Sequence, residues 1–144
     1  MTESILQFLK SQKAATIACV DEQNRPYCFS CFFAFDGSSH LLYFKSSYSS
    51  HHAQLLLRNP VVSGTVLPDK LNPLAVQGLQ FTGTVLHPDA PADARATGEY
   101  YKKFPLALAL PGDVWTLRLD SVKMTDSSKI FGKKTLWKRE EEPS

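Results

Sequence analysis

The chain has 144 residues and a formal net charge of +2 at pH 7, so it is long enough for one domain and too weakly basic to indicate nucleic-acid binding by charge alone. Hydrophobic residues make up 43% and charged residues 21%, which excludes a globally disordered chain. No apolar run approaches the roughly 20 residues of a membrane span. The start, MTESILQFLKSQ, lacks a signal-peptide pattern, so we expect a cytoplasmic protein.

The first elements predicted are a short helix and three strands. Thr2 can cap the helix, whose apolar residues recur at helical spacing up to Leu9. Turn-forming residues then separate three apolar, aromatic-rich stretches, which are Ala14–Val20, Tyr27–Phe35 and Leu41–Lys45. We expect these stretches to form a meander of antiparallel strands.

The three cysteines lie on the first two predicted strands. Cys28 and Cys31 have the spacing of a redox or metal motif, but side chains three apart on a strand point to opposite faces. We therefore expect no metal site. If the first hairpin closes symmetrically about Gln23 and Asn24, Cys19 lies opposite Cys28, and both stay thiols in a reducing compartment.

A second helix is predicted after the third strand. Ser49 or Ser50 is a suitable N-cap, and Pro60 ends the segment. The residues spaced as a buried stripe are Ala53, Leu56 and Leu57.

The second half of the chain returns mostly to strands. The predicted elements are a strand at 61–66, a loop at 68–73, a long or bent strand at 74–86, a helix at 92–103 capped by Asp89, a strand at 114–124, a loop at 125–134 and a strand at 135–138. Gly78 and Gly83 inside the long strand indicate a bulge, a bend or a close backbone approach. We expect one domain over residues 1–139, followed by a disordered acidic tail at 140–144.

Hydroxyls and imidazoles gather where the third strand meets the second helix. The unpaired amides of a helix start favour an anion, and Ser50, His51, His52 and the nearby Lys45 add donors, so this corner is either a phosphate site or a plain helix cap. His51 and His52 point about 100° apart around the helix, which argues against a metal pair.

Basic residues are concentrated near the C-terminus, where seven of the sixteen Lys and Arg lie from Arg118 onward. This region is either a solvated strand pair or part of an anion site. The small net charge and the acidic tail argue against nucleic acid as the partner.

The order of these features resembles the FMN-binding split barrels related to pyridoxamine 5'-phosphate oxidase. The resemblance is carried by a D-x-x-x-R-P turn in DEQNRP, the serine-rich helix start KSSYSSHH, the N-P-x-V step in NPVV, and GLQFTGTV. It implies a mainly β fold, an antiparallel split barrel of six to seven strands with helices at the barrel ends. It also implies a homodimer with FMN at the interface.

The resemblance further implies a set of cofactor-binding residues. The residues expected along the flavin ring are Ser30, Cys31 and Phe32, with Gln80 as a looser match. The residues expected around the phosphate are Lys45, Ser46, Ser50, His51 and His52. Those expected to close the site, from the same chain or from a partner, are Lys133, Lys134 and Trp137.

Two departures from the family pattern bear on the activity. His51 and His52 replace the common Arg-Lys pair, and imidazole is a weaker phosphate ligand than guanidinium. Ser30 stands where the oxidases have an arginine, and their arginine-rich C-terminal signature is absent. We therefore do not expect oxidation of pyridoxamine phosphate, and no residue is assigned a catalytic role.

Two functional hypotheses follow. The first is an FMN-dependent oxidoreductase acting on an unidentified small molecule. The alternative is a non-enzymatic dimeric binding or stress-response protein whose cofactor affinity is weak or lost, or whose cofactor is heme or a deazaflavin. A yellow protein whose absorption bands change on reduction would favour the first.

The first testable prediction is the homodimer. Light scattering at micromolar concentration should give about twice the 16.1 kDa mass of the chain. A stable monomer that binds the cofactor fully would contradict it.

Overall fold

The computed structural model describes residues 1–87, 95–127 and 133–140. The elements in chain order are α1 (Glu3–Ser11), β1 (Ala14–Val20), β2 (Pro26–Asp36), β3 (Leu41–Ser46), α2 (His51–Arg58), β4 (Val61–Val66), β5 (Gln77–Val85), α3 (Ala96–Lys103), the 3-10 helix η1 (Pro105–Ala109), β6 (Asp113–Asp126) and β7 (Lys133–Lys138). No helix within the described ranges is long and apolar enough to cross a membrane.

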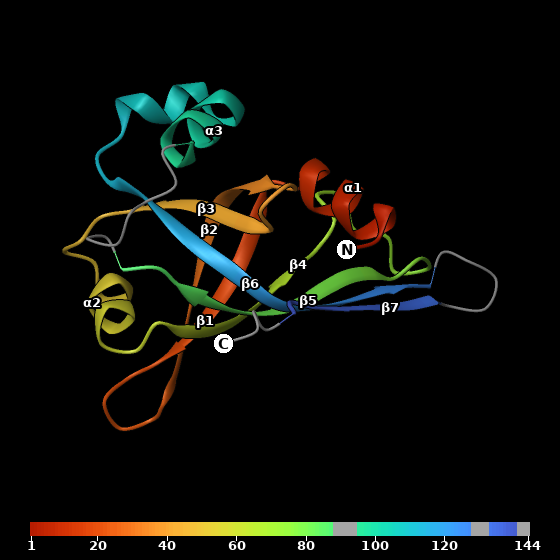
Figure 1. The fold of residues 1–144 in the computed structure, drawn as a ribbon, viewed down its shortest axis with the longest axis horizontal. Helices are drawn as coiled ribbons and strands as arrows, with labels where there is room; N and C mark the ends of the chain where they lie inside the picture. Colours follow the sequence, from red (N-terminus) through yellow and green to blue (C-terminus); the bar gives the residue numbers. More distant parts are fainter. Residues whose placement is uncertain (88–94, 128–132, 141–144) are drawn as a thin grey trace.

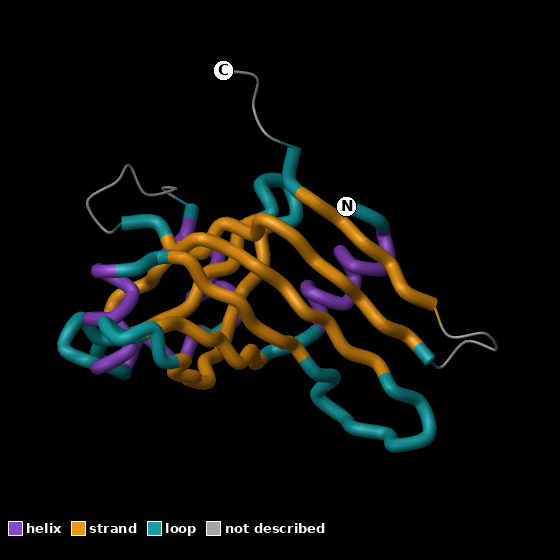
Figure 2. Tube along the Cα trace, turned by 90° about the horizontal axis from the view of Figure 1, so that it is seen from below, coloured by secondary structure: helices purple, strands orange, loops and turns teal. Residues whose placement is uncertain are grey.

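The strands form a closed antiparallel barrel with one additional strand (Figures 1 and 2). Their order is β3-β2-β1-β4-β5-β6-β7, and a further pairing between β3 and β6 closes the ring of six. β6 is long enough to pair with β3 through its first half and with β7 through its second half. The predicted mainly β split barrel is therefore confirmed.

One hydrophobic cluster fills the barrel, because inward-facing residues alternate with outward-facing ones along each strand. Both early helices contribute to it: α1 supplies Ile5 and Leu9, and α2 supplies Ala53 and Leu56, all at most 2% exposed. Figure 1 shows these helices at different ends of the barrel, as predicted.

The third helix, α3, packs on the outside of the barrel. Tyr100 and Ala96 of α3 form a second, smaller cluster with Ala34 of β2 and Tyr43 of β3. In Figure 1, α3 and the η1 segment that follows it lie beside β3, on the side of the molecule where β6 begins. This arrangement creates a space between the barrel wall and η1.

The two strand glycines singled out from the sequence differ in their roles. The register of β5 against β6 shifts between Thr82 and Gly83, and a Cβ on Gly83 would lie 2.7 Å from the carbonyl oxygen of Arg118. Gly83 therefore sits at the predicted bulge and close approach. A Cβ on Gly78 would make only ordinary contacts.

Several predicted boundaries were wrong. Residues 74–76 precede β5 rather than belonging to it, and η1 was not predicted. β6 and β7 extend beyond the predicted 114–124 and 135–138, because their ends pair with each other across register positions that sequence alone does not reveal. The helix predicted from 92 is described from Ala96, while its predicted cap, Asp89, and residues 141–144 of the predicted tail lie outside the described residues.

The helix starts only partly match the predictions. Ser50, rather than Ser49, is the N-cap of α2, and its hydroxyl accepts a bond from the amide of Ala53 at 3.3 Å. Thr2 occupies the cap position of α1 without a capping bond from its side chain. On α2 the buried stripe includes Leu55, whereas Leu57 is only partly buried.

The predicted cysteine register was wrong by one residue. Cys19 pairs with Tyr27, and Cys28 pairs with Ala18, because the turn is centred on Gln23, with Asn24 at a φ of +59°. Cys19 is consequently buried and Cys28 exposed, on opposite faces of the hairpin.

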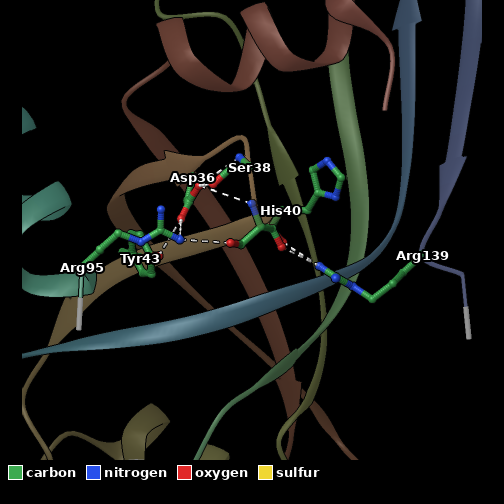
Figure 3. A network of polar contacts seen from close by, with 7 residues as sticks. Asp36, Ser38, His40, Tyr43, Arg95 and Arg139 are labelled. Carbon is green, nitrogen blue, oxygen red and sulfur yellow. Dashed lines mark hydrogen bonds and ion pairs between the residues drawn. The ribbon is translucent and has the colours of Figure 1, made fainter. Parts of the chain in front are cut away.

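A buried carboxylate organises the β2–β3 turn (Figure 3). Asp36, 8% exposed, accepts bonds from the Ser38 hydroxyl at 2.7 Å and the Tyr43 hydroxyl at 3.2 Å, and pairs with Arg95 at 3.0 Å. Burial alone would raise the pKa of Asp36, but these donors and the amides of Ser38 and Ser39 outweigh it and hold the pKa below its usual value. The carboxylate therefore stabilises the turn in its ionised form.

The C-terminal end of β7 is attached to the same turn. The Arg139 guanidinium donates to the carbonyl oxygens of His40 at 2.9 Å and Ser39 at 3.1 Å, while its Nε donates to Leu119 at 2.7 Å. His40 has a φ of +56° and contacts the Trp137 ring edge-on at 4.8 Å. Figure 3 shows Asp36 and Arg139 acting on opposite sides of this one turn.

We predict that Asp36→Asn lowers the free energy of unfolding by about 2 to 3 kcal/mol, because it removes a charged acceptor from buried donors. Asp113→Asn, at an exposed position, is the control and should change it by less than about 0.5 kcal/mol. The Asp36 contribution should be present above the unfolded-state pKa of about 3.9 and be lost as pH falls through the lower native pKa. Equal urea midpoints for the two variants would contradict this assignment.

Candidate functional site

A cleft of about 700 Å³ lies between the barrel wall and the α3–η1 segment. Its apolar lining includes Phe29 and Phe32 of β2 together with Phe104 and Leu106. The polar corner, at the end of β3 and the start of α2, is lined by Lys45, Ser46, Ser47 and His52. Concave sites of this size with an apolar wall and a few converging polar groups are typical of small-molecule binding.

The polar corner is the turn between β3 and α2. The Ser46 hydroxyl lies 2.6 Å from Nε2 of His52 and 3.2 Å from the Ser50 hydroxyl. Ser50 also donates to the Ser47 carbonyl at 2.8 Å while capping α2. The indole of Trp115 on β6 donates to the Ser46 carbonyl at 3.1 Å, which ties the turn to the barrel.

The two adjacent histidines have different surroundings. The His52 ring stacks on Phe29, with centroids 3.9 Å apart and planes 8° apart, and it lines the cleft. Burial, followed by the nearby His51, lowers the pKa of His52 and favours the neutral imidazole. His51 instead meets Tyr27 edge-on at 4.9 Å and does not line the cleft.

Lys45 lines the cleft, but its ammonium already has partners. It donates to the carbonyl oxygens of Ala107 and Leu110, both at 2.6 Å, and lies 5.0 Å from the centre of the Tyr101 ring. These bonds attach the end of η1 to β3, so Lys45 holds the wall of the cleft in place. Its expected role as a phosphate ligand stays a prediction.

The predicted ring-side residues also line the cleft. Ser30, Cys31 and Phe32 all do so, and Phe32 is 59% exposed. Burial raises the pKa of the Cys31 thiol to about 12, so Cys31 contributes a neutral thiol rather than a thiolate nucleophile. No group of three metal-ligating side chains occurs among the residues for which placements are described.

Lys103 lines the cleft and was not predicted from the sequence. Its ammonium donates to the carbonyl of Gln12 and lies 4.8 Å from the centre of the Phe33 ring. Burial lowers the pKa of Lys103 to about 8, with a smaller lowering by Lys13 and an opposing effect of Asp69. The approach of α3 to the end of α1 is a tertiary contact, so no local pattern around Lys103 could have indicated it.

The remaining predicted residues lie elsewhere in the same chain. Gln80 and Trp137 line a second concavity of about 640 Å³ on the outer face of β1, β4, β5, β6 and β7. Lys133 and Lys134 are exposed at the start of β7, paired with Asp126 and Thr125 of β6. Ser50 and His51 are not among the residues that line the first cleft. One chain therefore brings together only part of the predicted set.

The sequence and the fold correspond to a known family. A family model described as pyridoxamine 5'-phosphate oxidase matches residues 1–126. The chain belongs to the pyridoxamine 5'-phosphate oxidase family. Among its relatives in this family, a UPF0306 protein of Yersinia pseudotuberculosis is 32% identical over 137 residues, which cover 95% of this chain and 92% of the relative.

Solved structures share the fold of this family member at low sequence identity. A heme binding protein from Mycobacterium smegmatis has a TM-score of 0.75 at 18% identity; the match covers 91% of this chain and 55% of that longer chain. A FAD-binding protein from Mesorhizobium loti has a TM-score of 0.69 at 16% identity, covering 88% and 93%. An F420 reductase has a TM-score of 0.62 at 21% identity, covering 85% and 98%.

We predict that Lys45→Met releases η1 from β3. Hydrogen exchange of the Ala107 and Leu110 amides should become at least about tenfold faster, because two charge-assisted bonds are lost. Lys102→Met, on the exposed side of α3, is the matched control and should leave this exchange unchanged. Unchanged exchange in Lys45→Met would show that η1 is held by its apolar contacts alone.

Proposed function

We propose that this protein binds FMN in the cleft between the barrel and η1 and acts as a flavin-dependent oxidoreductase on a small molecule other than pyridoxamine phosphate. The observation that supports this most is the pairing, in one cleft, of a hydroxyl-rich helix start with an aromatic wall. Flavin mononucleotide has the matching composition, a phosphate at one end and a flat ring system at the other.

The phosphate would bind at the β3–α2 turn. Ser46 and Ser50 supply hydroxyls, and the first amides of α2 point out of a helix start, where a negative charge is stabilised. His52 supplies an imidazole that is already within hydrogen-bonding distance of Ser46. A bound phosphate would favour protonation of His52, opposing the effect of burial.

The ring would lie along β2. Phe29 and Phe32 of β2, together with Phe104 and Leu106 of the α3–η1 segment, offer the apolar surface. Phe32 and Phe104 contact each other, with ring centroids 5.5 Å apart, so the β2 and α3–η1 parts of this apolar surface meet there. Ser30, which follows Phe29 in β2 and lines the cleft, offers a neutral hydroxyl as a hydrogen-bonding group for a ring edge.

When bound, the flavin supplies the electron or hydride transfer chemistry. The chain's own part is to orient the ring, exclude water from one of its faces and neutralise the phosphate. Ser30 offers neither a charge nor a strong acid, which supports a substrate other than the one after which the family is named. A proton needed at the ring would come from solvent or from the substrate, since Cys31 keeps its proton.

A homodimer would bring together the predicted cofactor-binding residues, which lie in separate places in one chain. The outer face around Gln80 carries small and hydroxyl side chains, including Thr16, Ala18 and Thr65, which permit close approach of a second sheet. Leu136 on this face is 71% exposed. A second copy covering it would bury this leucine and bring its own Lys133, Lys134 and Trp137 near the first chain's cleft.

Heme is the second candidate ligand, in a binding protein rather than an enzyme. His52 supports it, because burial favours the neutral imidazole that ligates iron. Its Nε2 would have to leave the Ser46 hydroxyl to do so. Absorption spectra recorded after incubation with FMN or with hemin, followed by gel filtration, separate the two candidates. We expect the protein to retain FMN and not hemin.

The test of the phosphate corner compares FMN with riboflavin. FMN should bind more tightly, and His52→Ala should reduce the preference by roughly tenfold, because a charge-assisted bond to the phosphate is lost. His51→Ala is the matched control, since this neighbouring ring faces Tyr27. Flavin fluorescence quenching gives both affinities.

The preference for FMN should also depend on pH with a definite sign. Bound phosphate raises the pKa of His52, so the imidazole's contribution is fully present below the pKa of the free protein and is lost as pH rises through the bound-state pKa. His52→Ala should flatten this dependence. Equal binding of FMN and riboflavin in the unmodified protein would mean that the corner is only a helix cap.

A further inference from the structure

The cleft is cationic. Two residues with ammonium groups, Lys45 and Lys103, line it, and no Asp or Glu is among the described residues that do so; His52 also lines it, but burial favours its neutral imidazole. A concave site with basic and no acidic groups attracts and retains anions, because low-dielectric walls concentrate the field. The proposed FMN phosphate would place one anionic group in the cleft, at the β3–α2 turn.

The two ammonium groups have different surroundings. Lys45 is bonded to two carbonyl oxygens of the η1 segment, whereas for Lys103 one hydrogen bond is found within the described part of the chain, to Gln12. An ammonium has three donors, so Lys103 retains donors for a ligand. Two aromatic rings lie near it, with the ring centres of Phe33 and Phe104 at 4.8 and 5.5 Å, and the charged groups that act on it are Asp69 and Lys13.

Lys103 lies at the opposite end of the cleft from the phosphate corner. His52 stacks on Phe29, and Lys103 lies over Phe33, four residues further along β2. Four residues of a strand span about 13 Å. The cleft thus has the His52 imidazole near one end and Lys103 near the other, and Phe32, which also lines it, is 59% exposed.

We propose that Lys103 is a specificity-determining residue that selects an apolar, ring-bearing substrate carrying a carboxylate. The inference rests on the proposed function, because a flavin phosphate at the Ser46–His52 corner leaves Lys103 for the substrate. Phe32 and Leu106, 59% and 89% exposed, supply the apolar contact beside it. A partly desolvated ammonium binds a carboxylate more strongly than it binds a neutral amide of the same shape.

A purely structural role for Lys103 makes a different prediction. If the bond to Gln12 served only to hold α3 against the end of α1, the charge of a ligand in the cleft would have no effect on its affinity. The proposal is therefore tested by ligand charge rather than by stability.

The experiment compares 2-naphthoate with 2-naphthamide, which share a ring system and differ in charge. Equilibrium dialysis against the full chain, with and without FMN, should show the carboxylate bound about tenfold more tightly. Lys103→Met should remove this preference and Lys103→Arg should keep it. Lys102→Met, at the exposed neighbouring lysine on α3, should leave it unchanged.

The pH dependence gives a second readout. The groups facing Lys103 are Asp69 and Lys13, and Tyr100 and Cys31 line the same cleft with pKa values raised by burial. A bound carboxylate favours the ammonium, so the preference should be full below pH 8 and be lost at higher pH. Lys103→Arg should extend the preference to higher pH, since guanidinium stays charged.

Two results would overturn the proposal. Equal affinities for the two naphthalene compounds in the unmodified protein would show that Lys103 does not discriminate between ligands by their charge. Loss of the FMN-over-riboflavin preference in Lys103→Met would show that Lys103 binds the cofactor phosphate instead. A protein that binds no FMN but prefers naphthoate through Lys103 would refute the proposed function and retain this site.

Discussion

The pairing of β3 with β6 is the contact on which the rest of the structure depends. It runs from Leu41 opposite Arg118 to Ser46 opposite Asp113 and converts an open sheet into a closed barrel. Without it, β3 would be an unprotected sheet edge, and the core would be open along one side. Closure also fixes the end of β3, from which the β3–α2 turn begins.

The β3–β6 pairing also positions the segments that form the cleft. Lys45 leaves β3 outward and holds η1, and Gly112, with a φ of +123°, lets the chain pass from η1 into β6 close to the backbone of Ser46. Trp115, one strand across, anchors the turn through the Ser46 carbonyl. The cleft is consequently made of segments far apart in sequence that meet only because β3 and β6 pair.

The sequence was informative where local physics dominates. Alternating apolar residues located the strands, Pro60 ended α2, and Gly83 marked the bulge. The serines and histidines of the β3–α2 turn were correctly placed together, because they lie within one short turn. The cysteine register failed by one residue, since the position of the hairpin turn depends on the left-handed backbone of Asn24, which competing turn types leave open.

The tertiary structure decided what each of these residues does. Neighbouring histidines became unequal, one stacked on Phe29 in the cleft and the other against Tyr27, because the packing of α2 against β2 sets their directions. The Lys45 ammonium is bound to a carbonyl oxygen at the end of the η1 segment, and Lys103 lines the cleft while its ammonium contacts the end of α1. The sequence by itself determined the strands and the polar turn, since these follow from periodicity and local hydrogen bonding, and its resemblance to a family implied the barrel. Which cations face the cleft was decided only by the fold, because the partners that bind or desolvate each ammonium come from distant segments.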